Sequence, residues 1–200
     1  MKAAVFDEYG PPGVLKLEDV EVPAPADDEV LMRVAAASVN PGDWDVMRGT
    51  PYILRPMTGL RRPRNRILGL AVSGRVEAVG ADVAGLKPGD EVYAGIGGGG
   101  FAEYALASLT SCALKPSNLT FNQAAAVPVA GTTALQGLRD VARVQSGQKV
   151  LINGASGGVG TFAVQIAGAL GAVVTGVCST TMPAQAVRGT RVRRGSAHSG

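Results

Sequence analysis

The chain has 200 residues, of which 46% are hydrophobic, and it carries a formal net charge of +3. This length allows one large domain or two small ones, and the apolar fraction is sufficient to fill a core. The composition excludes a secreted, disulfide-bonded or membrane-spanning class. No apolar run reaches the roughly 18 residues that a membrane span needs, and no signal peptide is visible. Cys112 and Cys178 lie far apart in the sequence, without a pattern that predicts a disulfide bond and without the spacing of metal ligands. We therefore expect a soluble, cytoplasmic protein without a membrane partner.

The first 115 residues predict short β-strands separated by turn residues, which is typical of a partly open β-barrel. The predicted strands are KAAVF (2–6), LKLEDVEV (15–22), EVLMRVAAA (29–37), GRVEAVG (74–80), DEVYA (90–94) and AEYALA (102–107). A short helix is expected after Asn40, because Pro41 suits a first helical turn and Asp43 favours the positive end of a helix.

The pattern changes at Thr120, and residues 121–144 predict a helix interrupted by Pro128. Five of its residues follow helical spacing: Ala134, Leu135, Leu138, Val141 and Ala142. The continuous apolar run KVLIN (149–153) then predicts a strand that is buried on both faces, as in a parallel sheet.

A second strand, AVVTGV (172–177), is predicted after a helix that ends at Gly171. The helix has an apolar stripe at Val159, Phe162, Ala163, Ile166, Ala167 and Leu170. We expect a parallel pair of strands joined by a right-handed helical crossover. Beyond Thr180 the sequence predicts neither helix nor strand, so the sheet is expected to stop after two strands.

Glycines lie between the first of these strands and the helix, in the segment VLINGASGGVG (150–160). Their spacing is a variant of the dinucleotide-binding fingerprint, and the strand and helix around them meet the structural condition for that fingerprint. Gly154 would allow a sharp exit from the strand, Gly157 and Gly158 a close approach of a pyrophosphate, and Gly160 close packing of helix on strand. The predicted cofactor-binding residues of this turn are Gly154, Ala155, Gly157, Gly158, Val159 and Gly160.

The end of the second strand bears on the choice of cofactor. An acidic residue there would bind the ribose 2′-hydroxyl of NAD and repel a 2′-phosphate. The chain instead has Cys178, Ser179 and Thr180. Because small hydroxyl groups can donate to a phosphate, we expect NADP(H) as the cofactor, with Ser179 and Thr180 at its binding site.

Several segments in the same order and spacing resemble the medium-chain dehydrogenase/reductase superfamily, in its zinc-independent, quinone oxidoreductase-like branch. They are AAASVNPGDWDVMRG (35–49), ILGLAVSGRVEAVGADVAGLKPGDEVYA (67–94), FAEYAL (101–106), AAAVPVAGTTALQGL (124–138) and VLINGASGGVGTFAVQIAGALGA (150–172). The resemblance implies an α/β protein with a GroES-like barrel at residues 1–125 and a partial Rossmann domain at 126–182. It also implies that NADPH lies between these two domains. Residues 183–200 match nothing in the family and are expected to be disordered.

The resemblance also bears on metal and substrate. Zinc members of the superfamily have cysteine at the position of Asn40 and Gly-His-Glu at the positions of Gly69, Leu70 and Ala71, so no metal site is expected here. Without a Lewis acid the acceptor must already be electrophilic, as quinones and α,β-unsaturated carbonyl compounds are.

Three further residues are candidates for the site. Asn40 matches the family asparagine that lines the substrate cleft, and a role as a helix cap is equally open. Tyr52 could donate its hydroxyl to the acceptor, although an ordinary loop residue is the favoured interpretation. Thr133 matches the threonine that contacts the nicotinamide amide, with Thr132 as an alternative.

Six arginines lie between Arg48 and Arg66, and we interpret this segment as a solvated flexible loop. A site for an acidic substrate or for nucleic acid is the alternative, but no interleaved aromatic residues support nucleic acid as a partner.

Members of the family are much longer than this chain, so we expect it to be truncated at the C-terminus, with a tail from a shifted reading frame. The expected function is NADPH-dependent hydride transfer to a small quinone or enone acceptor. The alternative is a non-enzymatic remnant. Longer relatives are expected to be homodimers, whereas this chain is expected to be monomeric or to aggregate, with its nucleotide-binding half weakly ordered.

Overall fold

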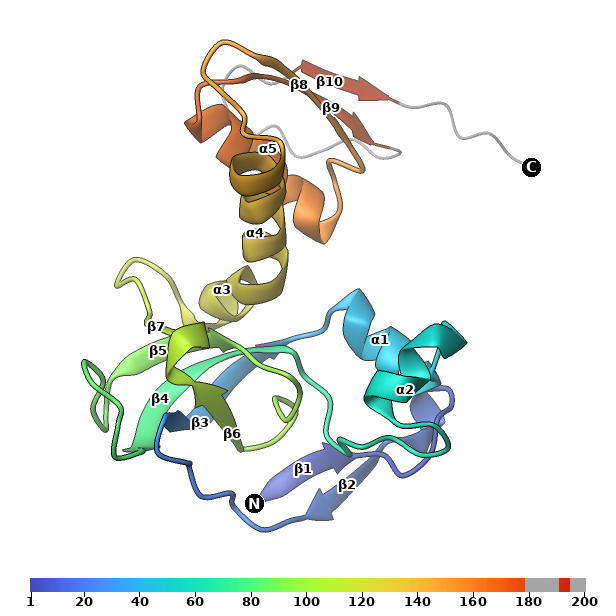
Figure 1. The fold of residues 1–200 in the computed structure, drawn as a ribbon, viewed down its shortest axis with the longest axis vertical. Helices are drawn as coiled ribbons and strands as arrows, with labels where there is room; N and C mark the ends of the chain where they lie inside the picture. Colours follow the sequence, from blue (N-terminus) through green and yellow to red (C-terminus); the bar gives the residue numbers. More distant parts are fainter. Residues whose placement is uncertain (179–190, 195–200) are drawn as a thin grey trace. The chain divides into compact units, whose positions relative to one another are not determined.

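The chain forms two compact units, Met1–Val129 and Ala130–Gly200, in a computed structural model that describes residues 1–178 and 191–194 (Figure 1). Unit 1 consists mainly of β-strands, and unit 2 combines a parallel sheet with helices. This is the α/β fold that the sequence predicts. Of the helices in the described ranges, none is both long enough and apolar enough to cross a bilayer.

A five-stranded antiparallel sheet, curled into a half-barrel, is the main element of unit 1, with strand order β6-β3-β4-β5-β7. Its strands are β3 (Glu29–Ser38), β4 (Ala71–Val79), β5 (Glu91–Gly95), β6 (Tyr104–Ser108) and β7 (Cys112–Leu114). Two register shifts interrupt the pairing of β3 with β4, and such irregularities bend a strand and raise its twist. The inward-facing side chains of Val30, Met32, Val72 and Val92 are completely buried. The strand β7 was not among the predicted strands.

A second, two-stranded sheet lies in unit 1, where β1 (Lys2–Val5) pairs antiparallel with β2 (Lys16–Asp19). Isolated bridges from Ala3 to Ala102 and from Val5 to Ile67 connect it to later parts of the unit. Short 3₁₀ turns at Pro12–Val14 (η1) and Leu109–Ser111 (η3) complete the β-rich part. The six predicted strands are therefore all present, with ends that differ by up to three residues.

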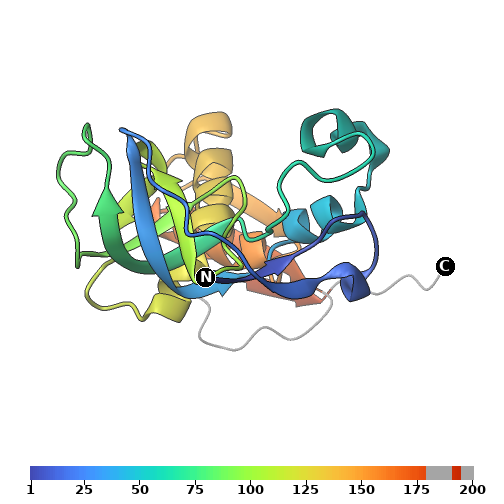
Figure 2. The same cartoon turned by 90° about the horizontal axis from the view of Figure 1, so that it is seen from below.

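Three short helical elements stand to one side of the five-stranded sheet (Figures 1 and 2): α1 (Pro41–Arg48), η2 (Tyr52–Leu54) and α2 (Arg55–Thr58). The helix α1 begins where the sequence predicts, and it ends at Gly49, whose φ of 62° is the left-handed conformation that glycine adopts readily. The expectation of a loop between Arg48 and Arg66 is wrong for residues 52–58, which form η2 and α2.

The predicted long helix after Thr120 is divided into α3 (Phe121–Ala125), α4 (Val127–Leu135) and a π-helical segment, η4 (Gln136–Val141). Pro128 lies in the first turn of α4, where its missing N–H is not needed. The expectation that Val141 belongs to the apolar stripe of this helix is wrong, because its side chain is 81% exposed. A π-helix changes the residue spacing to i→i+5, so residues after Leu138 no longer follow the α-helical stripe.

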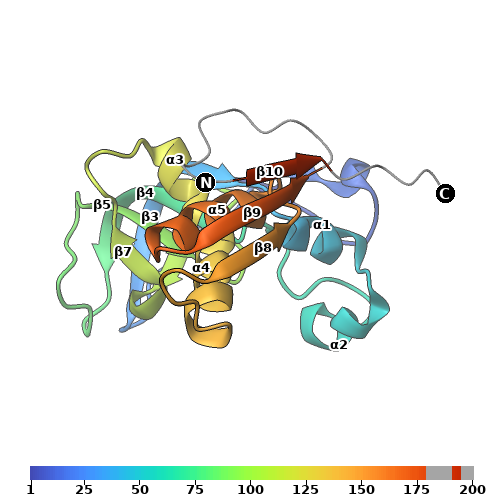
Figure 3. The same cartoon turned by 90° about the horizontal axis from the view of Figure 1, so that it is seen from above.

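Unit 2 contains a parallel sheet with strand order β10-β9-β8 and one crossover helix, α5 (Figure 3). The bounds are β8 (Lys149–Asn153), α5 (Gly158–Ala169), β9 (Val173–Cys178) and β10 (Arg191–Arg194). The strand–helix–strand order is as predicted. The expectation that the sheet stops after two strands is wrong, because the backbone of Arg191–Arg194 pairs parallel with β9.

Burial in unit 2 differs from the sequence prediction in two ways. The buried face of α5 contains Gly160, Ala163, Val164 and Ala167, while Val159 is 41% exposed. Small residues occupy this face because the helix lies close to the strands, and Phe162 and Ile166 pack at its margin. In β8, Leu151 is 69% exposed, so the strand is covered on one face only and not on both.

Candidate functional site

The turn between β8 and α5 is closed by two backbone hydrogen bonds. Gly154 leaves the strand with a φ of 72°, a conformation that L side chains rarely adopt. The N–H of Gly157 donates to the carbonyl oxygen of Gly154 at 2.9 Å, and the N–H of Ala155 donates to Val177 of β9 at 3.0 Å. Ala155 is completely buried, so its methyl group and amide serve the turn itself and are not free to contact a ligand.

Gly160 is required by internal packing. A Cβ atom at this position would collide with the carbonyl oxygen of Gly154 and lie 2.8 Å from the Cα of Ala155. The residue therefore allows the start of α5 to lie directly against the turn, as expected from its place in the fingerprint.

Gly158 differs from Gly160, because a Cβ atom at Gly158 would have no neighbouring atom within 4 Å. Internal packing thus gives no reason for glycine there, and the space beside it is open. Gly157 is intermediate, with its added Cβ at 3.3 Å from the carbonyl oxygen of Gly154. Open space on the backbone at the start of a helix is what a bulky anion needs for close approach.

The first turn of α5 offers amide groups to such a ligand. The first intrahelical hydrogen bond runs from the N–H of Thr161 to the carbonyl oxygen of Gly157 at 2.9 Å. The N–H groups of Gly158, Val159 and Gly160 precede it and have no acceptor within the helix. The first turn also contains no acidic residue, so nothing there opposes a phosphate at the positive end of the helix dipole. The residues of the turn therefore fit a dinucleotide pyrophosphate.

The residues expected near the ribose are only partly described. Cys178 ends β9 and is 4% exposed. Ser179 and Thr180 lie outside the described residues, so their predicted role stays a prediction.

The carboxamide of Asn40 is engaged within unit 1. Its Nδ2 donates to the carbonyl oxygen of Ser38 at 3.2 Å and to the hydroxyl of the same residue at 3.1 Å. Its backbone N–H donates to the carboxylate of Asp43 at 2.8 Å. These contacts fix the half-buried side chain at the end of β3, and its role at the acceptor stays a prediction.

Tyr52 and Thr133 belong to different units. Tyr52 is 70% exposed on η2, and the guanidinium of Arg55 lies 4.6 Å from the centre of its ring. Thr133 is exposed on α4. The proposed roles of both residues in substrate and cofactor binding stay predictions.

The expectation of no metal site, which rests on Asn40, Gly69, Leu70 and Ala71, stays a prediction. Gly69 has a φ of 102°, and its N–H donates to the carboxylate of Asp43 at 2.9 Å. Ala71 is completely buried. Among the described residues no cluster of three His, Cys, Asp or Glu side chains could hold a metal.

Asp43 has a larger structural role than the sequence analysis gave it. It is 2% exposed, and its carboxylate accepts the N–H groups of both Asn40 and Gly69. It therefore connects the start of α1 to the segment that precedes β4. The sequence signal is its place three residues after Asn40, the spacing of a capping box.

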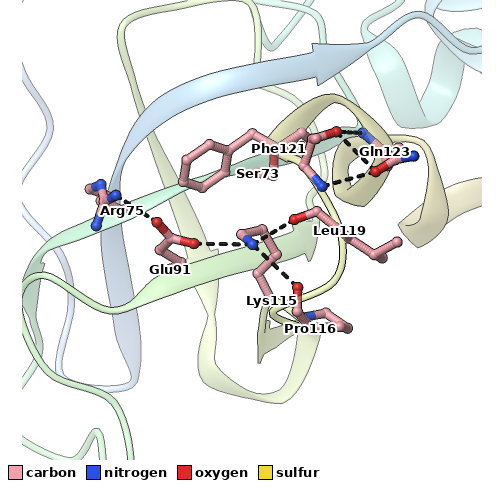
Figure 4. Close-up of polar contacts among 9 residues, drawn as sticks. Ser73, Arg75, Glu91, Lys115, Pro116, Leu119, Phe121 and Gln123 are labelled. Carbon is pink, nitrogen blue, oxygen red and sulfur yellow. Dashed lines mark hydrogen bonds and ion pairs between the residues drawn. The ribbon is translucent and has the colours of Figure 1, made fainter.

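Sequence reasoning also missed a charged network on the five-stranded sheet (Figure 4). Lys115 has a side chain that is only 5% exposed, and its Nζ lies 3.0 Å from the carboxylate of Glu91. The same Nζ donates to the carbonyl oxygens of Leu119 at 2.7 Å and Pro116 at 3.2 Å. Arg75 pairs with the other oxygen of Glu91. The pKa of Glu91 is lowered chiefly by the hydrogen bond from Lys115. The positive charges of Lys115 and Arg75 lower it further.

The helix α3 begins beside this network. Ser73 donates its hydroxyl to the carbonyl oxygen of Phe121 at 2.6 Å (Figure 4). Thr120 and Gln123 form reciprocal cap contacts, in which the N–H of Thr120 donates to Oε1 of Gln123 at 2.9 Å. The spacing Thr-x-x-Gln is a capping signal that the sequence analysis could have used.

Cys112 is not a candidate nucleophile. Burial raises the pKa of its thiol to about 11, so the neutral thiol predominates at neutral pH, and the thiolate is the reactive form.

The chain is similar to oxidoreductases. Residues 26–117 match the family described as "Alcohol dehydrogenase GroES-like domain". Quinone oxidoreductase of Sus scrofa is 42% identical over 182 residues, which cover 90% of this chain and 53% of the relative. The 2-methylene-furan-3-one reductase of Solanum lycopersicum is 40% identical over 177 residues, covering 84% of this chain and 44% of the relative.

A solved mycobacterial structure complexed with NADPH is 32% identical, with a TM-score of 0.78, and the match covers 90% of this chain and 53% of that one. The chain thus spans about half the length of the curated relatives it matches. Together with the half-barrel of unit 1 and the glycine turn of unit 2, these similarities relate the chain to quinone oxidoreductases and related reductases over about half of their length.

Proposed function

We propose that the protein is an NADPH-dependent oxidoreductase that reduces a quinone or an α,β-unsaturated carbonyl compound without a metal. The observation that carries this proposal is the glycine turn, where open space beside Gly158 adjoins three amide groups without a helical acceptor. The names of the relatives support the acceptor class, because one is a quinone oxidoreductase and another a 2-methylene-furan-3-one reductase.

The first turn of α5 would hold the pyrophosphate of the cofactor. The N–H groups of Gly158, Val159 and Gly160 donate to the phosphate oxygens, and the helix dipole adds to the attraction. When bound, NADPH supplies the hydride. The strand β9 ends in Cys178 without a carboxylate, which favours a 2′-phosphate over the free ribose hydroxyl of NADH.

On the acceptor side, polar side chains would stabilise the negative charge that develops on the carbonyl oxygen. Asn40 is our candidate, because its Nδ2 is a hydrogen-bond donor held by Ser38 and could exchange that contact for the acceptor. Tyr52 could donate a second hydrogen bond. The positions of Asn40, Gly69, Leu70 and Ala71 carry no zinc-type ligands, so the acceptor must be electrophilic without a Lewis acid.

The alternative is a non-enzymatic protein in which unit 2 binds no nucleotide. The exposure of Leu151 and Val173, at 69% and 53%, favours it, because a poorly covered sheet is a weak support for a site. Calorimetric titration with NADPH and NADH, followed by quinone-dependent oxidation of NADPH, separates the two. Binding that is stronger for NADPH together with turnover supports the proposal, whereas the absence of binding by the folded chain supports the alternative.

A further inference from the structure

The segment around η2 and α2 exposes large apolar side chains that no core accounts for. Ile53 is 81% exposed, Met57 77%, and Tyr52 and Leu60 are each 70% exposed. Arginines are interspersed with them at Arg55, Arg61, Arg62 and Arg64. We call these eight residues the apolar–basic patch.

The sequence segment that carries the patch is strongly basic. From Val46 to Val76 the sequence contains no acidic residue, and it contains seven arginines: Arg48, Arg55, Arg61, Arg62, Arg64, Arg66 and Arg75. Arg66 pairs with Asp7 and Glu18, and Arg75 pairs with Glu91. Within the part of the chain that the structure describes, the other five form no ion pair with a carboxylate. Arg62 still lies close enough to Asp7 to help lower the pKa of that carboxyl group, so the uncompensated charge belongs to the remaining four arginines.

Polar contacts connect the segment that carries the patch to the rest of unit 1. The hydroxyl of Tyr9 donates to the carbonyl oxygen of Gly59 at 2.6 Å, and Nε of Arg55 donates to the carbonyl oxygen of Gly49 at 3.0 Å. The guanidinium of Arg55 also lies 4.8 Å from the centre of the Tyr9 ring. These contacts fix the segment of η2 and α2 against the rest of unit 1, while Ile53 and Met57 remain exposed.

We propose that the apolar–basic patch docks on the surface of an anionic lipid bilayer. Burial of exposed aliphatic side chains at the boundary between headgroups and acyl chains stabilises the bound state. Arginines are attracted to anionic headgroups. Tyr52 suits the interface, where aromatic residues are enriched. A second copy of this chain fits less well, because two such patches would repel each other. Peripheral docking needs no spanning helix, and it departs from the expectation that the protein has no membrane partner.

Flotation of the full chain with vesicles tests the proposal, using phosphatidylcholine alone or mixed with phosphatidylserine. We expect binding to the mixed vesicles only. The double variants Ile53→Ser/Met57→Ser and Arg61→Gln/Arg64→Gln should each weaken it by about tenfold or more. Two matched controls should leave binding unchanged. Leu17→Ser/Leu114→Ser removes apolar side chains that are 72% and 57% exposed outside the patch, and Arg33→Gln/Lys87→Gln removes the same charge from exposed positions elsewhere.

Three results would overturn the proposal. The first is an absence of binding to the mixed vesicles by the folded chain. The second is an equal loss of binding in the charge control, which would show unspecific attraction by net charge. The third is full binding by Ile53→Ser/Met57→Ser, particularly if a short RNA competes for it, because this would make the patch a polyanion site that does not need apolar contact.

Discussion

The two larger sheets of this protein differ in how completely their apolar side chains are covered. In the five-stranded sheet of unit 1, Val30, Met32 and Val72 are inaccessible to solvent. In the three-stranded sheet of unit 2, Ile152 and Val174 are buried against α5, but Leu151 and Val173 on the other face are 69% and 53% exposed. An antiparallel sheet that curls can enclose part of its own core, whereas a parallel sheet needs helices on both faces.

The two units therefore differ in expected stability and in the candidate site that they carry. Unit 1 has the larger enclosed core, and we expect it to be the more stable part. Unit 2 carries the candidate cofactor site on a sheet with one covered face. That unit 2 is weakly ordered or prone to aggregation stays a prediction.

Shortening one side chain on each sheet tests most strongly whether the two sheets differ in how well they are covered. Met32→Ala creates a cavity in unit 1 and should lower the free energy of unfolding by about 2–5 kcal/mol. Leu151→Ala removes a side chain that is already largely in water, so the change should stay within about 0.5 kcal/mol. Urea denaturation monitored by circular dichroism measures both. A large loss for Leu151→Ala would mean that its face is covered in solution.

The glycines of unit 2 offer a second test. Gly160→Val places a side chain against the carbonyl oxygen of Gly154, and overpacking of this kind costs about 1–3 kcal/mol or more. Gly158→Val is the matched control, because its Cβ meets no atom within 4 Å. Thermal unfolding should therefore show a clearly lower Tm for Gly160→Val only. Equal Tm values for the two variants would contradict the packing that we describe.

The Lys115 network tests a polar contribution in unit 1. Lys115→Met keeps much of the buried stem but removes the donor to Leu119, Pro116 and Glu91. Because those oxygens then lose a charged partner, we expect a loss of about 1–3 kcal/mol in the free energy of unfolding. Lys87→Met, at an exposed position, is the control and should have little effect. An unchanged stability for Lys115→Met would show that the network is energetically neutral.

The pH dependence of the same network should be smaller. Glu91 has a lowered pKa, chiefly because of the hydrogen bond from Lys115. A lowered pKa stabilises the folded state above the ordinary value of 4.5 for a glutamate, and this contribution is lost as the pH falls through the folded-state pKa. The difference in stability between wild type and Glu91→Gln should therefore shrink below about pH 4.5. A difference that grows on acidification would give the opposite sign and refute this assignment.

Local signals were sufficient to predict much of the fold. Pro41 and Asp43 marked the start of α1, and the run 149–153 followed by glycines marked β8 and the turn before α5. Features that depend on distant contacts were missed or wrong. The burial of Lys115 needs the pairing of β5 with β7, and the position of β10 needs its pairing with β9. The buried face of α5 was displaced because the close approach at Gly160 favours small residues there.

For the site, the sequence predicted the turn but not the separate roles of its glycines. Gly154 follows from its positive φ and Gly160 from packing, whereas at Gly158 neither reason applies and the space beside the backbone is open. Only the three-dimensional structure makes this distinction, because all of these positions are glycine in the sequence. The roles of Asn40 and Thr133 rest on family resemblance and that of Tyr52 on its hydroxyl group, and all three stay predictions.

Calorimetric titration of wild type and Gly158→Val with NADPH tests the central claim most directly. The valine side chain would occupy the space beside the first amides of α5, while circular dichroism verifies that the fold is retained. We predict that wild type binds NADPH and that the variant binds it at least about tenfold more weakly. Equal affinity in the two proteins would contradict the account, because the phosphates would then not lie against the glycine turn.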